Sequence, residues 1–226
     1  MKNILVIAAH PDDELLGLGA TLNKHILNGN QVSTFILGEG LTSRKSSRNS
    51  TSKSSLNKLQ KDALRANKTL GIENVIFGNL PDNRLDSMDR LEIIKRVEST
   101  IETLKPSIIY THHEGDRNID HRIIYDAVLT ACRPLNYNPV KELITFETPS
   151  STEWGFMNSK SFNPNLFVDV TDQLNVKLKA FEEYSSEIRD FPHPRSLRAL
   201  KAMAEKWGSA IGTEYAEAFR IIWKRE

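Results

Sequence analysis

Cysteine and long apolar runs are the scarcest features of this chain. Its 226 residues include one cysteine, Cys132, so neither an intrachain disulfide nor a cysteine-rich zinc module can form. Cys132 lies in an apolar pattern of helical spacing, which indicates a small buried side chain rather than a reactive thiol. No apolar stretch approaches the length of a membrane-spanning helix, so a membrane span is not expected.

Net charge is also small. Thirty basic residues against 29 acidic ones leave +1, which gives no general argument for binding nucleic acid or a membrane surface. The apolar run near the N-terminus is too short for a signal peptide and acids follow it at once, so we expect a cytoplasmic protein. The length and ordinary composition suit a single domain over residues 1–226.

The chemistry begins where the first apolar run ends. Residues 4–9 are continuously apolar, as buried parallel strands are, and they stop at His10, Pro11, Asp12, Asp13 and Glu14. Carboxylates are rarely buried without a partner. Ligands of open α/β sheets bind just beyond the carboxyl ends of the strands. The stretch therefore predicts half of a metal site.

Apolar strand patterns and helical patterns alternate along most of the chain. This alternation predicts an α/β protein with a doubly wound, mainly parallel sheet and helices on both faces. The segment 215–223 fits either a helix or a strand. We expect strands at 3–9, 31–37, 74–77, 107–111, 143–146 and 166–170, and helices at 14–28, 56–70, 88–104, from His121 to about 133, 172–186 and 195–211.

A second polar burst follows the fourth expected strand, from His112 to His121. Right-handed crossovers in the common strand order put the first and fourth strands side by side, where the winding direction reverses. Asp13 and His121 are therefore expected in one crevice although they lie 108 positions apart. The convergence of the two bursts is the main functional inference that the residues alone support.

His10, Asp13 and His121 together supply two imidazoles and one carboxylate. Three protein ligands with open positions are typical of a catalytic metal site, and this donor set suits Zn²⁺ but also Fe²⁺, Mn²⁺ or Co²⁺. Asp12, next to them, is placed to take a proton from an attacking water. The alternative is a helix N-cap with an ordinary polar contact at each strand end.

Ala9-His10-Pro11-Asp12-Asp13-Glu14, together with the later Asp116-Arg117-Asn118-Ile119-Asp120-His121, resembles the LmbE-like, or PIG-L, deacetylase family. Stretches such as 80–82, 147–151, 193–196 and 215–219 extend the resemblance over most of the chain. The resemblance implies a Rossmann-like sheet and a metal-dependent, usually zinc-dependent, hydrolase that deacetylates N-acetylated amino sugars such as N-acetylglucosamine, or related glycoconjugates. It makes His10, Asp13 and His121 the ligands and Asp12 the general base.

The chain departs from the family at Asn118, where several members carry a histidine that assists the carbonyl or the leaving amine. An asparagine amide can donate a hydrogen bond to an oxyanion or a sugar hydroxyl, but it cannot shuttle a proton. We expect Asp12 to return the proton, with Asp116, Asp120 and His113 as alternatives. Asp120 is either a carboxylate that orients a ligating imidazole or a cap of the following helix.

Three more residues are candidate substrate contacts. Glu147 ends the fifth strand, and His193 lies in a proline-flanked turn that the family shares. Arg44 belongs to a basic loop, 43–55, that is either a lid over an anionic substrate or a solvated flexible segment.

Other functions remain open at this stage. Two histidines and a carboxylate also form the site of ferrous oxygenases. Gly17-Leu18-Gly19 gives weak support to a dinucleotide-binding module, because the third glycine of that motif is missing. A glycan-binding protein without catalysis is a further alternative. The particular sugar, the metal used and whether the chain forms a homo-oligomer do not follow from the sequence.

Overall fold

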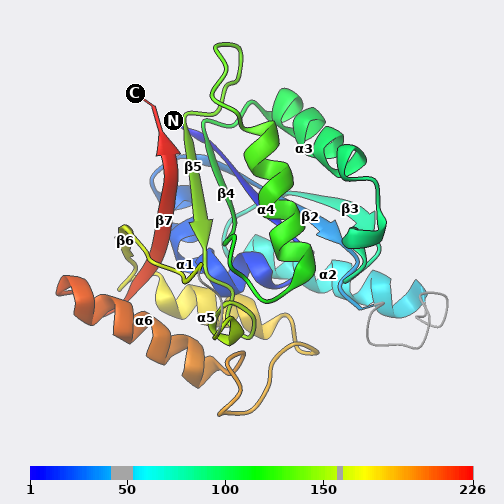
Figure 1. The fold of residues 1–226 in the computed structure, drawn as a ribbon. Coiled ribbons are helices and arrows are strands. Elements are labelled where there is room, and N and C mark those ends of the chain that lie inside the picture. The colour runs from blue at the N-terminus through cyan, green and yellow to red at the C-terminus, as the bar shows by residue number, and fades with distance from the viewer. Residues whose placement is uncertain (42–52, 157–159, 226) are drawn as a thin grey trace.

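The computed structural model describes residues 1–41, 53–156 and 160–225. Over these residues the chain forms a seven-stranded sheet in the order β3-β2-β1-β4-β5-β7-β6 (Figure 1). Its strands are β1 (Asn3–Ala8), β2 (Gln31–Gly38), β3 (Asn74–Leu80), β4 (Ile108–His112), β5 (Glu142–Phe146), β6 (Leu166–Asp169) and β7 (Ala216–Lys224). The helices are α1 (Asp13–Leu27), α2 (Lys53–Thr69), α3 (Arg90–Leu104), α4 (Ile119–Ala131), α5 (Leu174–Glu182) and α6 (Leu197–Ile211), with 3₁₀ turns η3 (Leu85–Ser87) and η4 (Thr152–Trp154).

The first strand lies at the point where the winding reverses. β1 pairs in parallel with β2 on one side and with β4 on the other, where Ile4 is opposite Ile108. β3 and β5 continue the parallel sheet outward, and β7 and β6 add two antiparallel strands at one edge. The predicted doubly wound, mainly parallel α/β fold and the pairing of the first and fourth strands are thus confirmed.

Both faces of the sheet are buried, which is why the central strands read as unbroken apolar runs. In β1, Ile4 and Val6 belong to the core beneath α1, α2, α5 and α6. Leu5 and Ile7 belong to the opposite core beneath α3 and α4. Cys132 is fully buried in this second core, as its apolar surroundings in the sequence predicted.

The boundaries of several elements differ from the sequence-based expectations. Segment 215–223 is the strand β7, and the expected helix 172–186 is shorter because α5 ends at Glu182 and turns follow. The predicted strand 74–77 continues to Leu80, and the helix expected from residue 56 already begins at Lys53. Helix ends depend on capping and tertiary contacts that local periodicity does not contain.

Helix α1 is interrupted at Leu18, whose φ of −151° and ψ of 18° are not helical. The backbone N–H groups of residues 20 and 21 donate to Glu217 of β7, at 3.2 and 2.7 Å. Lys177 of α5 donates to the carbonyl of residue 16 at 2.9 Å and pairs with Glu217 at 2.6 Å. A buried ion pair therefore satisfies backbone groups at the break, as any buried helix end requires.

Gly17, next to this break, is required by packing. A β-carbon at this position would come within 2.3 Å of the Phe146 ring. This close approach of β5 to α1 gives Gly17 a structural role, separate from the dinucleotide-binding motif considered from the sequence.

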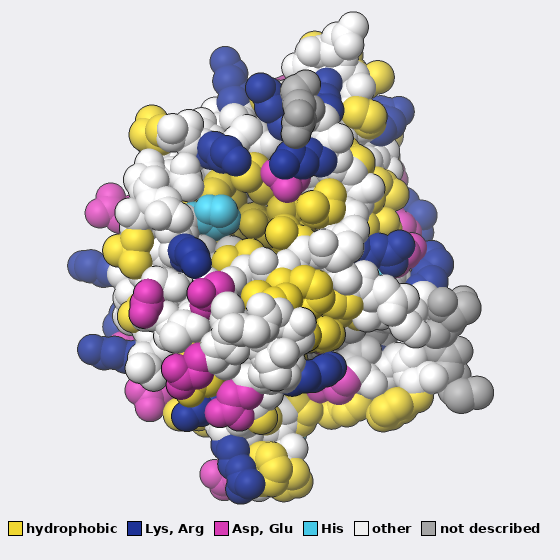
Figure 2. All heavy atoms as spheres, turned by 90° about the vertical axis from the view of Figure 1, so that its left-hand side faces the viewer, with side chains coloured by type: hydrophobic (Ala, Val, Ile, Leu, Met, Phe, Trp, Pro, Cys, Tyr) yellow, Lys and Arg dark blue, Asp and Glu magenta, His cyan; other side chains and the backbone are white. Residues whose placement is uncertain are grey.

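Figure 2 views the molecule from the left-hand side of Figure 1, where hydrophobic side chains gather in the middle of the face and charged ones surround them. β6 is the edge strand of the sheet, and partly buried hydrophobic residues of β6 and β7, among them Leu166, Val168 and Ile221, pack against the core. Among the helices in the described ranges, none combines the length and apolarity that crossing a bilayer needs.

Candidate metal centre

The turn between β1 and α1 holds the first two candidate ligands on one side. Asp12, which precedes the helix, has a φ of 109°, a conformation that residues other than glycine rarely adopt. The turn closes on itself because the His10 backbone N–H donates to Asp13 Oδ2 at 2.8 Å. This local bond fixes the Asp13 carboxylate next to the His10 ring.

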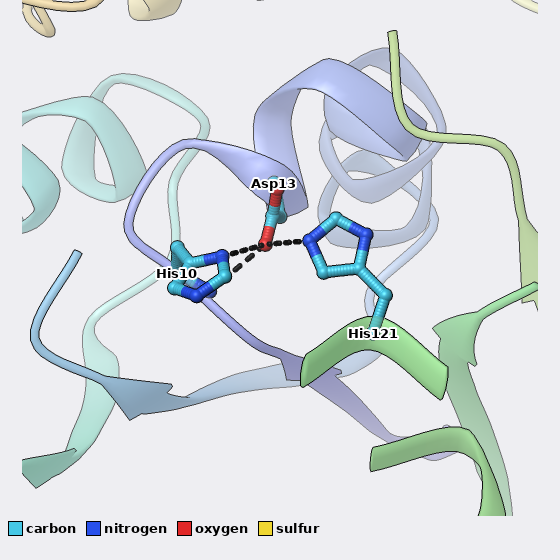
Figure 3. A group of neighbouring side chains, drawn as sticks. All are labelled: His10, Asp13 and His121. Atoms are coloured by element: carbon cyan, nitrogen blue, oxygen red, sulfur yellow. Dashed lines mark hydrogen bonds and ion pairs between the residues drawn. The ribbon is translucent and has the colours of Figure 1, made fainter. Parts of the chain in front are cut away.

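His121, in the first turn of α4, completes a group of three (Figure 3). Asp13 Oδ2 lies 3.3 Å from His121 Nε2 and 3.5 Å from His10 Nδ1. One donor atom of each of the three side chains lies within 4.8 Å of the others, and all three residues are buried. Two imidazole nitrogens and a carboxylate oxygen at one buried point fit a divalent transition metal such as Zn²⁺.

The other nitrogen of each imidazole faces carboxylates. His10 Nε2 lies 3.1 Å from Asp120 Oδ2 and 3.1 Å from Asp82 Oδ1. His121 Nδ1 lies 3.2 Å from Asp116 Oδ1. Histidines that bind metals usually have such a partner, which fixes the ring and its tautomer. The arrangement therefore leaves His10 Nδ1 and His121 Nε2 for the centre.

His10, Asp82 and Asp120 form a second group whose donor atoms lie within 4.8 Å of one another. Asp120 is already engaged there, because its two oxygens accept backbone N–H groups of Asn83 and Leu85 at 2.7 and 3.1 Å. These bonds connect α4 to the turn after β3. They favour an orienting role for Asp120 over a ligand role.

Asp116 is held as firmly on the other side. It accepts hydrogen bonds from the Asn118 backbone N–H at 2.8 Å, from Thr152 Oγ1 at 2.6 Å and from Ser151 Oγ. Burial lowers the pKa of His121, but the charges of Asp116 and Asp13 outweigh burial and raise it to about 9. Burial raises the pKa of Asp13, but the charge of His121 lowers it. The pKa of Asp13 therefore lies well below its usual value. The His121 shift reflects the negative charge of the two carboxylates, and the Asp13 shift reflects the imidazoles around it.

His112, at the end of β4, lies directly against His121, with ring centres 3.9 Å apart and nearly parallel planes. Its Nε2 accepts the backbone N–H of Ala9 at 2.8 Å, and its Nδ1 is 3.2 Å from Thr148 Oγ1. Burial and the neighbouring His121 lower the pKa of His112 to about 3, so it is neutral. With both nitrogens engaged, His112 supports the centre and joins β1 to β4.

Asp12 stands beside the three candidate ligands and contacts a residue far along the chain. Its Oδ2 lies 3.2 Å from Nη1 of Arg195, which is also 2.9 Å from Glu187 Oε2. Burial and the Asp13 carboxylate raise the pKa of Asp12 well above its usual value, and Arg195 opposes the rise. A cation bound by the neighbouring ligands would lower this pKa again.

These side chains surround a pocket of about 170 Å³. Its wall includes the acidic residues Asp12, Asp13, Asp82 and Glu187, and Arg195 is the one lysine or arginine among the described residues that line it. Sequence reasoning did not select Arg195, Glu187 or Asp82 as site residues. For Asp82 and Arg195, the available signal was their place in the stretches 80–82 and 193–196.

The remaining candidates from the sequence lie in different places. Asn118 lines the pocket and caps α4, since its Oδ1 accepts the Asp120 backbone N–H at 2.8 Å. His113 points elsewhere, with Nε2 2.8 Å from the carbonyl of residue 160. Glu147 accepts a hydrogen bond from Trp207 Nε1 at 2.5 Å.

His193 supports the turn that carries Arg195. Its Nδ1 accepts the Arg195 backbone N–H at 3.0 Å, and its ring meets Trp154 edge-on, with centres 6.2 Å apart. Neither His193 nor Glu147 belongs to the residues that line the pocket. Arg44 lies outside the described residues.

The fold and the site together define an α/β protein with a candidate metal centre at the switch point of a doubly wound sheet. The family model of the GlcNAc-PI de-N-acetylases, PIG-L, matches residues 5–132. An uncharacterized deacetylase of Escherichia coli K12, YaiS, is 32% identical over 193 residues, which cover 82% of this chain and 91% of that protein. The chain belongs to the PIG-L deacetylase family, as its motifs suggested.

Two more relatives are similar over nearly the whole chain. The diacetylchitobiose deacetylase of Thermococcus kodakarensis is 27% identical over 231 residues, covering 98% of this chain and 84% of that protein. The structure of the N,N'-diacetylchitobiose deacetylase from Pyrococcus horikoshii has a TM-score of 0.79 at 22% identity and covers 98% of this chain and 84% of that one. At this identity the structural likeness shows the fold.

Proposed function

We propose that the protein is a metal-dependent amide hydrolase that removes the acetyl group from an N-acetylated amino sugar or glycoconjugate. The observation that carries the proposal is the convergence of His10, Asp13 and His121 beside Asp12 in one pocket. Membership of the PIG-L family and the deacetylase relatives support the acetylated sugar as the substrate class.

His10 Nδ1, Asp13 Oδ2 and His121 Nε2 would hold the ion, with zinc as the first candidate and iron, manganese or cobalt as alternatives. When bound, the ion supplies Lewis-acid polarisation of the acetyl carbonyl and lowers the pKa of a nearby water. The paired carboxylates Asp116 and Asp120 keep both imidazoles in the tautomer that this role needs.

Asp12 is the residue that moves the proton. Its carboxylate accepts a proton from the water as the water oxygen bonds to the acetyl carbon. The same carboxyl group then gives the proton to the sugar nitrogen as the carbon–nitrogen bond breaks, so acetate and a free amine leave. Arg195 holds Asp12 Oδ2 at 3.2 Å and keeps the carboxylate on the pocket wall during both transfers.

Asn118 contributes hydrogen bonding. Its Oδ1 is used to cap α4, so the Nδ2 amide is the group left to donate a hydrogen bond toward the pocket that Asn118 lines. An amide donor stabilises negative charge on the carbonyl oxygen without transferring a proton. This assignment leaves Asp12 as the proton donor to the leaving amine.

The test is acetate release from a panel of N-acetylated sugars, using metal-stripped protein with single metals added back. We expect activity to return with at least one divalent ion. Asp12→Asn should lower turnover at least ~100-fold while leaving metal binding intact. Asp126→Asn, which changes an exposed aspartate of α4, is the matched control and should keep full activity.

Three results would contradict the proposal. Near-full activity of Asp12→Asn would remove the proposed base. Turnover that needs oxygen would favour the ferrous oxygenase alternative. Sugar binding without acetate release would favour a glycan-binding protein.

A further inference from the structure

Glu14, in the first turn of α1, is fully buried although it lies outside the candidate metal centre. Its carboxylate does not belong to the group formed by His10, Asp13 and His121, and it does not line the pocket beside Asp12. Carboxylates are rarely buried without strong partners. Neither metal binding nor contact with a substrate therefore explains why Glu14 is buried.

Three donors from different parts of the chain satisfy the Glu14 carboxylate. Its Oε1 accepts the Tyr184 hydroxyl at 2.6 Å and Asn67 Nδ2 at 2.9 Å. Its Oε2 accepts the backbone N–H of Asp12 at 3.1 Å. A carboxylate suits this position because it offers only acceptors, whereas an amide would bring an N–H group against one of the donors.

Two of these donors are fixed by the core. Tyr184, just after α5, is fully buried. Asn67 of α2 also donates to the carbonyl of residue 63 at 3.0 Å, and its Oδ1 accepts Thr34 Oγ1 of β2 at 2.9 Å. The Glu14 carboxylate is therefore held from β2, α2 and the segment that follows α5.

The third donor is the backbone of Asp12, which this network holds in place. The φ of 109° at Asp12 lies in the left-handed region, where a residue other than glycine stays only if its surroundings fix it. Glu14 fixes the Asp12 N–H, and Arg195 contacts the Asp12 carboxylate at 3.2 Å. A general base must stay within hydrogen-bond reach of the water that it deprotonates. The backbone conformation of Asp12 therefore decides whether its carboxylate can act.

We infer that Glu14 and Tyr184 are positioning residues that hold the Asp12 backbone in the conformation that turns its carboxylate into the pocket. The inference rests on the proposed function for the role of Asp12 as the base. A displacement of about 1 Å at a reacting group can cost about 100-fold in rate. Because neither Glu14 nor Tyr184 lines the pocket, their loss should lower kcat and leave KM unchanged.

The test compares acetate release by Tyr184→Phe, Glu14→Gln and the control Tyr110→Phe, each loaded with the ion that gives the wild type its highest activity. Tyr184→Phe removes one hydroxyl, and Glu14→Gln places an N–H group among the donors. We expect kcat to fall about tenfold in both, with KM and metal content unchanged. Tyr110→Phe removes another buried hydroxyl, 3.1 Å from His25 Nε2, and should leave kcat unchanged.

Combining Tyr184→Phe with Asp12→Asn separates positioning of the base from general support of the fold. If Tyr184 acts through Asp12, adding Tyr184→Phe to Asp12→Asn should lower the residual acetate release by less than about twofold. A further loss as large as that in the wild type would overturn the inference, and so would a wild-type kcat in Tyr184→Phe. If Glu14→Gln does not fold, Tyr184→Phe and the double variant decide the question.

A crystal structure of metal-loaded Tyr184→Phe tests the inference without activity. The Asp12 carboxylate should be displaced by more than ~0.5 Å from its wild-type position, while His10, Asp13 and His121 keep theirs. An unmoved Asp12 would contradict the inference. If the wild type releases acetate from no sugar of the panel, the proposed function fails, and this displacement still tests whether the network holds Asp12.

Discussion

Lys177 and Glu217 provide a sharp test of how the tail of the chain holds α1 in place. Their side chains are each 4% exposed and lie 2.6 Å apart, and they bond to backbone groups on both sides of the break in α1. Lys177→Met would leave the Glu217 carboxylate buried without its counter-charge. Removing one partner of a buried pair costs about 3–5 kcal/mol of unfolding free energy.

The assay is urea unfolding of wild type, Lys177→Met, Glu217→Gln and the double variant. The double variant carries no charge at either position. Its loss of unfolding free energy should therefore be smaller than the sum of the losses of the two single variants, by at least about 1 kcal/mol. Lys201→Met is the matched control. It breaks an exposed pair with Glu205, 3.9 Å apart, and a contact with the Tyr215 ring, whose centre is 5.6 Å away, and should cost about 1 kcal/mol or less.

A loss for Lys177→Met no larger than that for Lys201→Met would refute this reasoning. A loss in the double variant equal to the sum of the two single losses would also refute it. Such additivity would mean that the two side chains contribute independently and do not act as a pair. The slopes of the unfolding curves must agree among the variants for the comparison to hold.

Three further predictions concern Arg195, Cys132 and His25. Arg195→Gln should lower kcat/KM for acetate release about tenfold or more, because a charged hydrogen bond to Asp12 is lost, while metal content measured by mass spectrometry stays unchanged. Burial raises the pKa of Cys132 to about 12, so the native thiol should react with Ellman's reagent at pH 8 far more slowly than in urea. Burial, with Lys2 nearby, lowers the pKa of His25 from 6.5 to about 4, so the unfolded state binds the extra proton between these values. Stability should fall as pH drops from 6.5 toward 4, and His25→Gln should reduce that fall; an unchanged pH dependence would contradict the assignment.

The centre of the fold could be predicted because its signals are local. The apolar run before His10 marks a doubly buried strand, and the crossover rules then place it beside the strand before His121. The pairing of Ile4 with Ile108 confirms that the two strands are neighbours. The same two steps predict that His10, Asp13 and His121 lie in one crevice.

Local sequence patterns could not predict the contacts that the C-terminal part of the chain makes with the site and with α1. Arg195 reaches Asp12 across 183 positions through a turn whose path depends on α5 and α6. β7 was ambiguous because Glu217 occupies a buried position that an alternating pattern assigns to an apolar residue. The ion pair with Lys177 explains why Glu217 is buried, and no spacing along the sequence predicts that pair.

Anomalous diffraction at the metal edge, from crystals of the zinc-loaded protein, tests the central claim most directly. The account predicts a single strong peak about 2 Å from His10 Nδ1, Asp13 Oδ2 and His121 Nε2. A peak on the other side of the His10 ring, between Asp82 and Asp120, or no peak near His10, would contradict it.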